Sequence, residues 1–221
     1  MNIKAIETVY NGYRFRSRLE ARWAYFFDLL GVEYRYETEG YELSDGTRYL
    51  PDFWLPKQEE WVEIKGQNPS PDEAKKALRL CLDTGQSVHV CIDDPLDASI
   101  LDCHPMTAIH DPAFKRWLFQ LVLVGKDGGI YMGVDGEASE TVTLINSMGV
   151  FQHPTLDISY SLSHQLWFCE DCNRLFFGLL GLYKSDNCPI DALLTPRLKE
   201  ARSTARQARF EHGQTPTVNK G

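Results

Sequence analysis

The feature that most constrains the fold of this chain is a pair of strongly apolar strand-forming segments with charged residues embedded in them. Tyr49 to Leu55 and Trp61 to Lys65 are rich in aromatic and β-branched residues, and the turn-forming stretch 56–60 separates them. Two such segments joined by a short connection predict adjacent antiparallel strands. Charges inside them need a partner or an ion, because burying an unpaired charge is costly.

Alternation of side chains along a strand sorts the second segment into two faces. Glu63 and Lys65 share one face, about 7 Å apart along the strand, whereas Val62 and Ile64 point the other way into a core. Antiparallel pairing of the two segments would bring Asp52 beside Glu63. Two neighbouring carboxylates repel each other unless a cation lies between them, so we expect a metal site at this place.

Mg²⁺, or Mn²⁺ in its place, suits such a site because Mg²⁺ needs only one or two carboxylates beside waters and phosphate oxygens. The metal would lower the pKa of an attacking water and neutralise charge on a phosphate. Lys65 could orient or deprotonate that water, or hold the phosphate. A Glu-x-Lys triplet alone is common on ordinary exposed strands, and the apolar flanks are what favour a functional interpretation here.

The surrounding residues predict an α/β order. Apolar residues recur at helical spacing up to Gly31, which is typical of a helix C-terminus. Ser70 and Pro71 predict the start of a second helix. Further expected elements are strands over 32–36, 41–43 and 87–92, and the second helix is expected to run to about Asp83.

The later part of the chain is expected to be β-rich. We interpret 95–115 as a connector, 117–124 and 130–134 as a hairpin, 141–145 as a further strand and 196–210 as a helix. The predicted organisation is an α/β domain at 1–95, a connector and β-rich region at 96–160, and a C-terminal segment at 161–221.

The C-terminal segment contains a candidate structural zinc site. Cys169 and Cys172 have the spacing of a zinc knuckle, and Cys188 could supply a third thiolate. The fourth ligand is left open between His164, His153 and His212. The alternative is that Cys188 is a buried small residue and the other two an incidental pair. A zinc with all positions filled by protein would be structural, not catalytic.

Composition narrows the class of protein. A net charge of -8 argues against a protein that coats nucleic acid, yet residues 10–22 and the tail from Arg197 are locally basic. Lys75 and Lys76 in the second helix could contact phosphate or simply be solvated. No apolar run reaches the ~18 residues of a membrane span and no secretory signal is present. Scattered cysteines favour a reduced, cytoplasmic setting.

Pro51-Asp52, followed after ten residues by Glu63-Ile64-Lys65, resembles the PD-(D/E)XK signature of the restriction-endonuclease-like nuclease superfamily. The stretch 15–23 is similar to the first core helix of several phage and bacterial members. The resemblance covers roughly residues 1–95 and implies a mixed central β-sheet flanked by helices. It also implies that Asp52 and Glu63 bind the metal with the backbone carbonyl of Ile64, that Lys65 is catalytic, and that Glu20 assists.

Two roles remain open for Glu20. The resemblance places its carboxylate in the metal site. Ser17 to Glu20 is also a capping-box pattern, in which the glutamate satisfies a backbone N–H at the helix start. Helical geometry puts Glu20 on one stripe with Ala24 and Phe27, facing the edge of the core.

The function expected from these patterns is a Mg²⁺-dependent deoxyribonuclease, an endonuclease in phage or mobile-element DNA metabolism. A homodimer would suit two cuts on a duplex. The main alternative is a non-catalytic DNA-binding or adaptor protein that retains the nuclease fold, and the intact Asp, Glu and Lys positions argue against it. A hydrolase of another phosphorylated substrate is a third alternative, which no Gly-rich phosphate loop supports.

Overall fold

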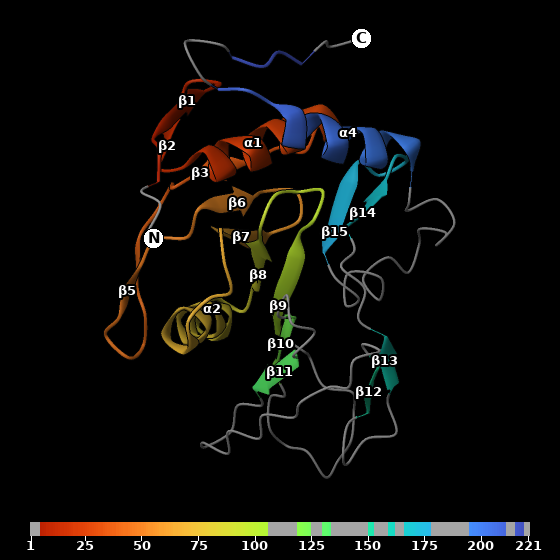
Figure 1. The fold of residues 1–221 in the computed structure, drawn as a ribbon. Coiled ribbons are helices and arrows are strands. Elements are labelled where there is room, and N and C mark those ends of the chain that lie inside the picture. The colour runs from red at the N-terminus through yellow and green to blue at the C-terminus, as the bar shows by residue number, and fades with distance from the viewer. Residues whose placement is uncertain are drawn as a thin grey trace.

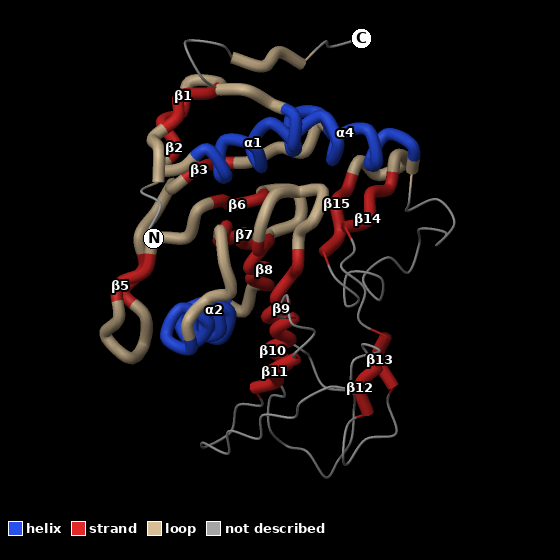
Figure 2. The backbone as a smooth tube through the Cα atoms, viewed as in Figure 1, coloured by secondary structure: helices blue, strands red, loops and turns tan. Residues whose placement is uncertain are grey.

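The computed structural model describes residues 5–105, 119–124, 130–133, 150–152, 159–161, 166–177, 195–210 and 215–218. This part of the chain is mixed α/β, as expected, with a mixed seven-stranded sheet and few helices (Figures 1 and 2). The sheet has the strand order β11-β10-β9-β8-β7-β6-β3, and β7 and β8 form its parallel pair. The described helices are each too short or too polar to cross a membrane.

The strands of this sheet are β3 (Arg35–Tyr36), β6 (Phe53–Leu55), β7 (Glu60–Lys65), β8 (Ser87–Ile92), β9 (Ser99–Pro105), β10 (Phe119–Val124) and β11 (Ile130–Gly133). Four two-stranded ribbons accompany it: β1 (Thr8–Tyr10) with β2 (Tyr13–Phe15), β4 (Tyr41–Glu42) with β5 (Arg48–Tyr49), β12 (Val150–Gln152) with β13 (Ser159–Ser161), and β14 (Leu166–Cys169) with β15 (Arg174–Phe177). The described helices are α1 (Arg18–Leu30), α2 (Pro71–Thr84) and α4 (Pro196–Gln207).

Helix α2 makes the crossover that the parallel pair β7 and β8 requires. Ser70 caps its start, where the Ser70 and Glu73 side chains exchange hydrogen bonds with each other's backbone N–H. Gly85 ends it in the left-handed conformation, with φ of 69°. The predicted second helix and the strand 87–92 are therefore confirmed.

The helices cover the two faces of the sheet. Figure 1 shows α1 and α4 along one side and α2 on the other, and α1 packs against α4. Val62 and Ile64 of β7 are buried in the core beneath α1, whereas Trp61 packs with Ala77 and the other buried residues of α2. The predicted alternation along β7 is thus confirmed, and the α1 side forms the larger, aromatic-rich core.

Two sequence interpretations were wrong. The strand expected over 49–55 is interrupted: β5 pairs with β4, and β6 begins only at Phe53. Pro51 has no N–H to donate to a ladder, which accounts for a break at this position. Part of the expected connector, Ser99–Pro105, is strand β9 and pairs antiparallel with β8, and its Ile100 is buried in the core despite the nearby prolines and aspartates.

Other expectations for the later residues were confirmed where they can be followed. Strands β10 and β11 form the predicted hairpin and join the main sheet through β9. Helix α4 begins at the predicted Pro196 and ends at Gln207, earlier than the expected Phe210. The strand expected over 141–145 lies outside the described residues, and the three-part domain division stays a prediction.

C-terminal residues contribute to the same core as α1. Phe168 and Phe177 of the β14–β15 hairpin and Leu198 of α4 are buried against it. Arg202 of α4 also reaches the loop after β8, where its guanidinium donates to the carbonyls of Pro95, at 2.8 Å, and Leu96. The guanidinium of Arg202 thus ties α4 to the end of the central strand β8.

Replacing Arg202 by Ala is expected to lower the free energy of unfolding by about 2 kcal/mol, since a hydrogen bond from a charged donor contributes about 1.5–3 kcal/mol. Urea unfolding measures this change. Lys199→Ala, at an exposed position of the same helix, is the control and should stay within about 0.5 kcal/mol of the parent. Equal stabilities of the two variants would show that Arg202 does not anchor α4.

Candidate active site

Two carboxylates face each other across β6 and β7. The register places Phe53 opposite Val62, so the next pair along is Asp52 and Glu63. The backbone N–H of Asp52 donates to Glu63 Oε2 at 3.3 Å, and both residues are buried, with 3% and 5% of their surface exposed. The juxtaposition expected from strand alternation is confirmed.

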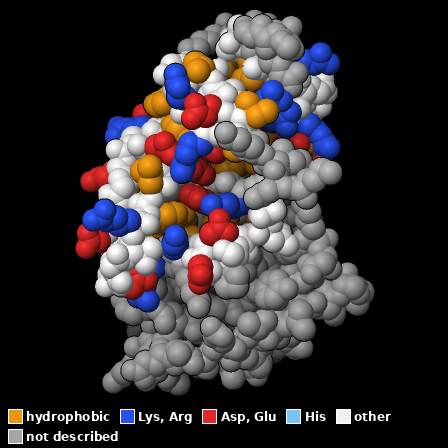
Figure 3. Space-filling model, turned by 60° about the vertical axis from the view of Figure 1, so that its left-hand side comes forward, with side chains coloured by type: hydrophobic (Ala, Val, Ile, Leu, Met, Phe, Trp, Pro, Cys, Tyr) orange, Lys and Arg blue, Asp and Glu red, His pale blue; other side chains and the backbone are white. Residues whose placement is uncertain are grey.

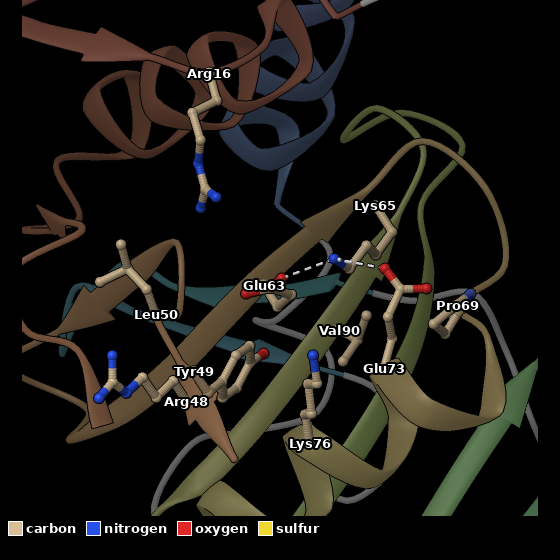
Figure 4. A pocket seen from close by; sticks show the side chains of 10 residues that line it. All are labelled: Arg16, Arg48, Tyr49, Leu50, Glu63, Lys65, Pro69, Glu73, Lys76 and Val90. Carbon is tan, nitrogen blue, oxygen red and sulfur yellow. Dashed lines mark ion pairs between the residues drawn. The ribbon is translucent and has the colours of Figure 1, made fainter. Parts of the chain in front are cut away.

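Lys65 lies on the same face of β7 as Glu63. Its Nζ is 2.9 Å from Glu63 Oε1 and 3.0 Å from Glu73 Oε1 of α2 (Figure 4). Burial by itself would lower the pKa of Lys65, but the two carboxylates outweigh burial and raise it. The ammonium is therefore charged at neutral pH and bridges β7 to the first turn of α2.

Asp52 is in a site that disfavours its ionised form. Burial raises the pKa of its carboxyl well above the ordinary value, and the nearby Glu63 and Glu20 carboxylates raise it further. Two donors partly offset this effect: the Ile64 N–H reaches Asp52 Oδ2 at 2.7 Å, and Arg16 Nη2 reaches Oδ1 at 2.9 Å. An added cation would relieve the remaining repulsion.

Glu20 is held mainly as a capping residue. Ser17 is the N-cap of α1, as predicted, and its hydroxyl donates to Glu20 Oε1 at 2.6 Å. Glu20 Oε2 accepts from the Tyr36 hydroxyl at 2.5 Å and from the N–H of Arg16 at 3.1 Å. The carboxylate thus caps the residue before the N-cap, yet it is close enough to raise the pKa of Asp52.

Two side chains of the site were not recognised in the sequence. Arg16 was noted only as part of a basic stretch, but its guanidinium pairs with Asp52 and Glu37. Glu73 lies in the first turn of the second predicted helix, where the sequence indicated no role for it in the site. Hydrogen bonds from Ser70 and Lys65 outweigh partial burial and lower the pKa of Glu73 to about 2. The Ser-x-x-Glu pattern soon after Lys65 was the available signal for Glu73.

The carboxylates at this place fit one Mg²⁺-like cation that takes only a few of its ligands from the protein. Within the described ranges, no three or more His, Cys, Asp or Glu residues are arranged to hold a metal ion. Asp52 and Glu63 alone supply the one or two carboxylates that Mg²⁺ uses. Arg16 and Lys65 now neutralise these carboxylates, so a metal would displace one or both cations. The Ile64 carbonyl as a further ligand stays a prediction.

A pocket of about 220 Å³ opens beside the pair. Figure 3 shows Lys, Arg, Asp and Glu side chains interleaved around a hollow on this face of the molecule. The pocket is lined by Arg16, Arg48, Tyr49, Leu50, Glu63, Lys65, Pro69, Glu73, Lys76 and Val90 (Figure 4). An anionic ligand in this pocket would therefore lie between basic side chains, close to the carboxylates.

The candidate zinc ligands are only partly placed. Cys169 ends β14 and is buried, and Cys172 is exposed in the turn that leads to β15. Cys188, His164, His153 and His212 lie outside the described residues, as does the side chain of Lys75. The zinc site stays a prediction.

Comparison of the chain with models of known protein families, with curated proteins and with solved structures found no match. Any functional conclusion therefore depends on the chemistry of the site itself. That chemistry is a buried carboxylate pair, a lysine held on the same strand and a basic pocket beside them.

Mg²⁺ is expected to raise the melting temperature of the wild-type chain by several degrees, because a ligand that binds only the folded state stabilises it. The cation binds the ionised carboxyl, so the increase should grow as pH rises through the raised pKa of Asp52. In Asp52→Asn the increase should be lost. Asp45→Asn, in an exposed turn, is the control and should respond like the wild type.

In the metal-free protein, the raised pKa of Asp52 should make the folded state less stable as pH rises. A carboxyl with a raised pKa favours folding below its ordinary pKa, near 4, and this contribution is lost as pH rises through the raised value. In EDTA, the wild type should therefore lose stability relative to Asp52→Asn as the pH rises from about 4 through the raised pKa of Asp52. An equal Mg²⁺ response in both proteins would rule out a metal at Asp52.

Proposed function

We propose that this protein is a Mg²⁺-dependent deoxyribonuclease that cuts DNA internally. The observation that carries the proposal is the buried pair Asp52 and Glu63, opposed across β6 and β7, with Lys65 on the same face. Two mutually repelling carboxylates in an apolar sheet cost stability, and a bound cation would offset that cost.

Each residue of the site would have its own role in the proposed hydrolysis. Asp52 and Glu63 would hold the Mg²⁺, which when bound supplies a more acidic water and neutralises charge on the phosphate. Arg16 would be released from Asp52 and become free to contact the phosphate. The Ile64 N–H would continue to orient the Asp52 carboxylate, since it donates to the second oxygen.

Lys65 acts as a cation and not as a base. In the metal-free site the Glu63 and Glu73 carboxylates outweigh burial and raise the pKa of Lys65, which favours an ammonium that orients the attacking water or holds a phosphate oxygen over one that accepts a proton. Glu73 would position it: with Glu63 holding the metal, the contact to Glu73, which is 3.0 Å in this structure, would remain to hold the ammonium.

The fold supports the same proposal. A helix, an antiparallel strand pair, a crossover helix and a parallel strand follow one another as α1, β6–β7, α2 and β8. This order resembles the restriction-endonuclease-like core, whose signature is intact at Asp52, Glu63 and Lys65. Action on phage or mobile-element DNA in the cytoplasm, as a homodimer, is the setting we propose with it.

One observation favours a second candidate, a non-catalytic DNA-binding or adaptor protein. All four oxygens of Asp52 and Glu63 already have a donor: Arg16 Nη2, the Ile64 N–H, Lys65 Nζ and the Asp52 N–H. A closed network of this kind could be purely structural. Metal-dependent cleavage separates the two candidates.

The deciding experiment incubates the chain with supercoiled, linear and branched DNA in Mg²⁺, Mn²⁺ or EDTA. Cleavage should need the metal, and Asp52→Asn or Glu63→Gln should lower its rate by about a hundredfold or more, because a metal supplies several kcal/mol of transition-state stabilisation. Glu42→Gln, at an exposed position on β4, is the control. Cleavage by Asp52→Asn at the parent rate would falsify the assignment.

Glu73→Gln tests how Lys65 is controlled. Glutamine serves equally in a capping box, so the helix start is retained, but the pKa of Lys65 should fall without the second carboxylate. The alkaline limit of the pH–rate profile should then move to lower pH, because Lys65 must stay protonated.

Ser70→Ala is the matched control for this shift. It removes the cap of α2 at a cost of about 1 kcal/mol but keeps the Glu73 carboxylate, and should leave the alkaline limit unchanged. A faster reaction of Glu73→Gln at neutral pH would contradict the proposal, since it would identify neutral Lys65 as a base.

A further inference from the structure

The pocket beside the carboxylate pair has two walls that come from different parts of the chain. One wall is the β4–β5 ribbon and the residue after it, which contribute Arg48, Tyr49 and Leu50. The other is the first half of α2, which contributes Glu73 and, one turn later, Lys76. Glu63 lines the same pocket, so a ligand between the walls would adjoin the proposed metal.

The cations of this pocket are of two kinds. Arg16 and Lys65 each pair with two carboxylates, so their charge is already compensated within the protein. In the part of the chain that the structure describes, no ion pair joins Arg48 or Lys76 to an acidic residue. These two side chains therefore retain charge for a ligand.

Of these two residues, Lys76 gives the stronger indication that the pocket binds an anion. It is half-buried, and Figure 4 shows its ammonium directed from α2 into the pocket, toward Glu63 and Tyr49. Within the described residues Lys76 forms no ion pair, so its ammonium can attract an anion that enters the pocket.

We infer that Lys76 and Arg48 bind a phosphate of the nucleic-acid backbone next to the one that is cleaved. The inference rests on the proposed function, because it takes the bound anion to be part of the same DNA strand. Tyr49, Leu50, Pro69 and Val90 give the pocket an apolar part that fits the sugar and the face of a base. The strand thus passes between the β4–β5 ribbon and α2.

The basic residues of α4 behave differently and supply a control. Arg202 and Arg206 bind carbonyls and carboxylates of the loop 94–97, and Arg197 lies over the Phe168 ring. Lys199 is exposed on that helix, which covers the face of the sheet opposite α2. Removing its charge changes the net charge by the same amount as removing that of Lys76, but away from the pocket.

The test is DNA affinity as a function of salt, measured with a labelled duplex in EDTA in an Asp52→Asn background. Each lost phosphate contact lowers the slope of log K against log salt by about 0.9. Lys76→Gln and Arg48→Gln should each show this decrease with several-fold weaker binding, whereas Lys199→Gln should keep the parent slope. Lys76→Arg, which retains the charge, should restore most of the slope and exclude misfolding as the cause.

The outcomes separate this inference from the proposed activity. A chain that never cuts DNA but shows the Lys76-dependent slope would retain the binding site and lose the nuclease assignment. A chain that cuts DNA while Lys76→Gln changes neither the salt slope nor KM would overturn the binding site and leave the nuclease. An unchanged slope in both Lys76→Gln and Arg48→Gln overturns the inference in every case.

Discussion

The repulsion between Asp52 and Glu63 inside an apolar sheet is the constraint around which the rest of the site is arranged. Neither carboxylate is accessible enough for water to screen it, so the protein supplies compensation from each side. Arg16 approaches Asp52 from the segment before α1, and Lys65 approaches Glu63 along β7. This balance is stable only while cations remain close, and the proposed metal would replace part of it.

The fold gives that balance a rigid frame. Phe53, which follows Asp52 directly, is fully buried and packs against Phe27 of α1 at a ring separation of 5.4 Å. On the other side, the crossover through α2 returns Glu73 to Lys65. The same residue thus caps a helix and holds the lysine, so the position of Lys65 depends on how the crossover packs.

Whether a cation of the pocket has an acidic partner depends on its distance from Asp52 and Glu63. Cations that touch Asp52 or Glu63 are paired, whereas Lys76 and Arg48 on the walls have no acidic partner in the described part. This arrangement explains how a chain with a net charge of -8 could still receive a polyanion, since the local field at the site, and not the total charge, governs approach.

The sequence alone determined the features that depend on near neighbours: the two faces of β7, the Ser17 and Ser70 caps, and the glycines that end α1 and α2. It also indicated Asp52 and Glu63 as partners, because strand alternation and one short turn are local. Only the tertiary structure decided strand β9, the Lys65–Glu73 bridge and the Arg16–Asp52 pair, whose members are 36 residues apart. Such contacts depend on how separate elements pack, which no local spacing encodes.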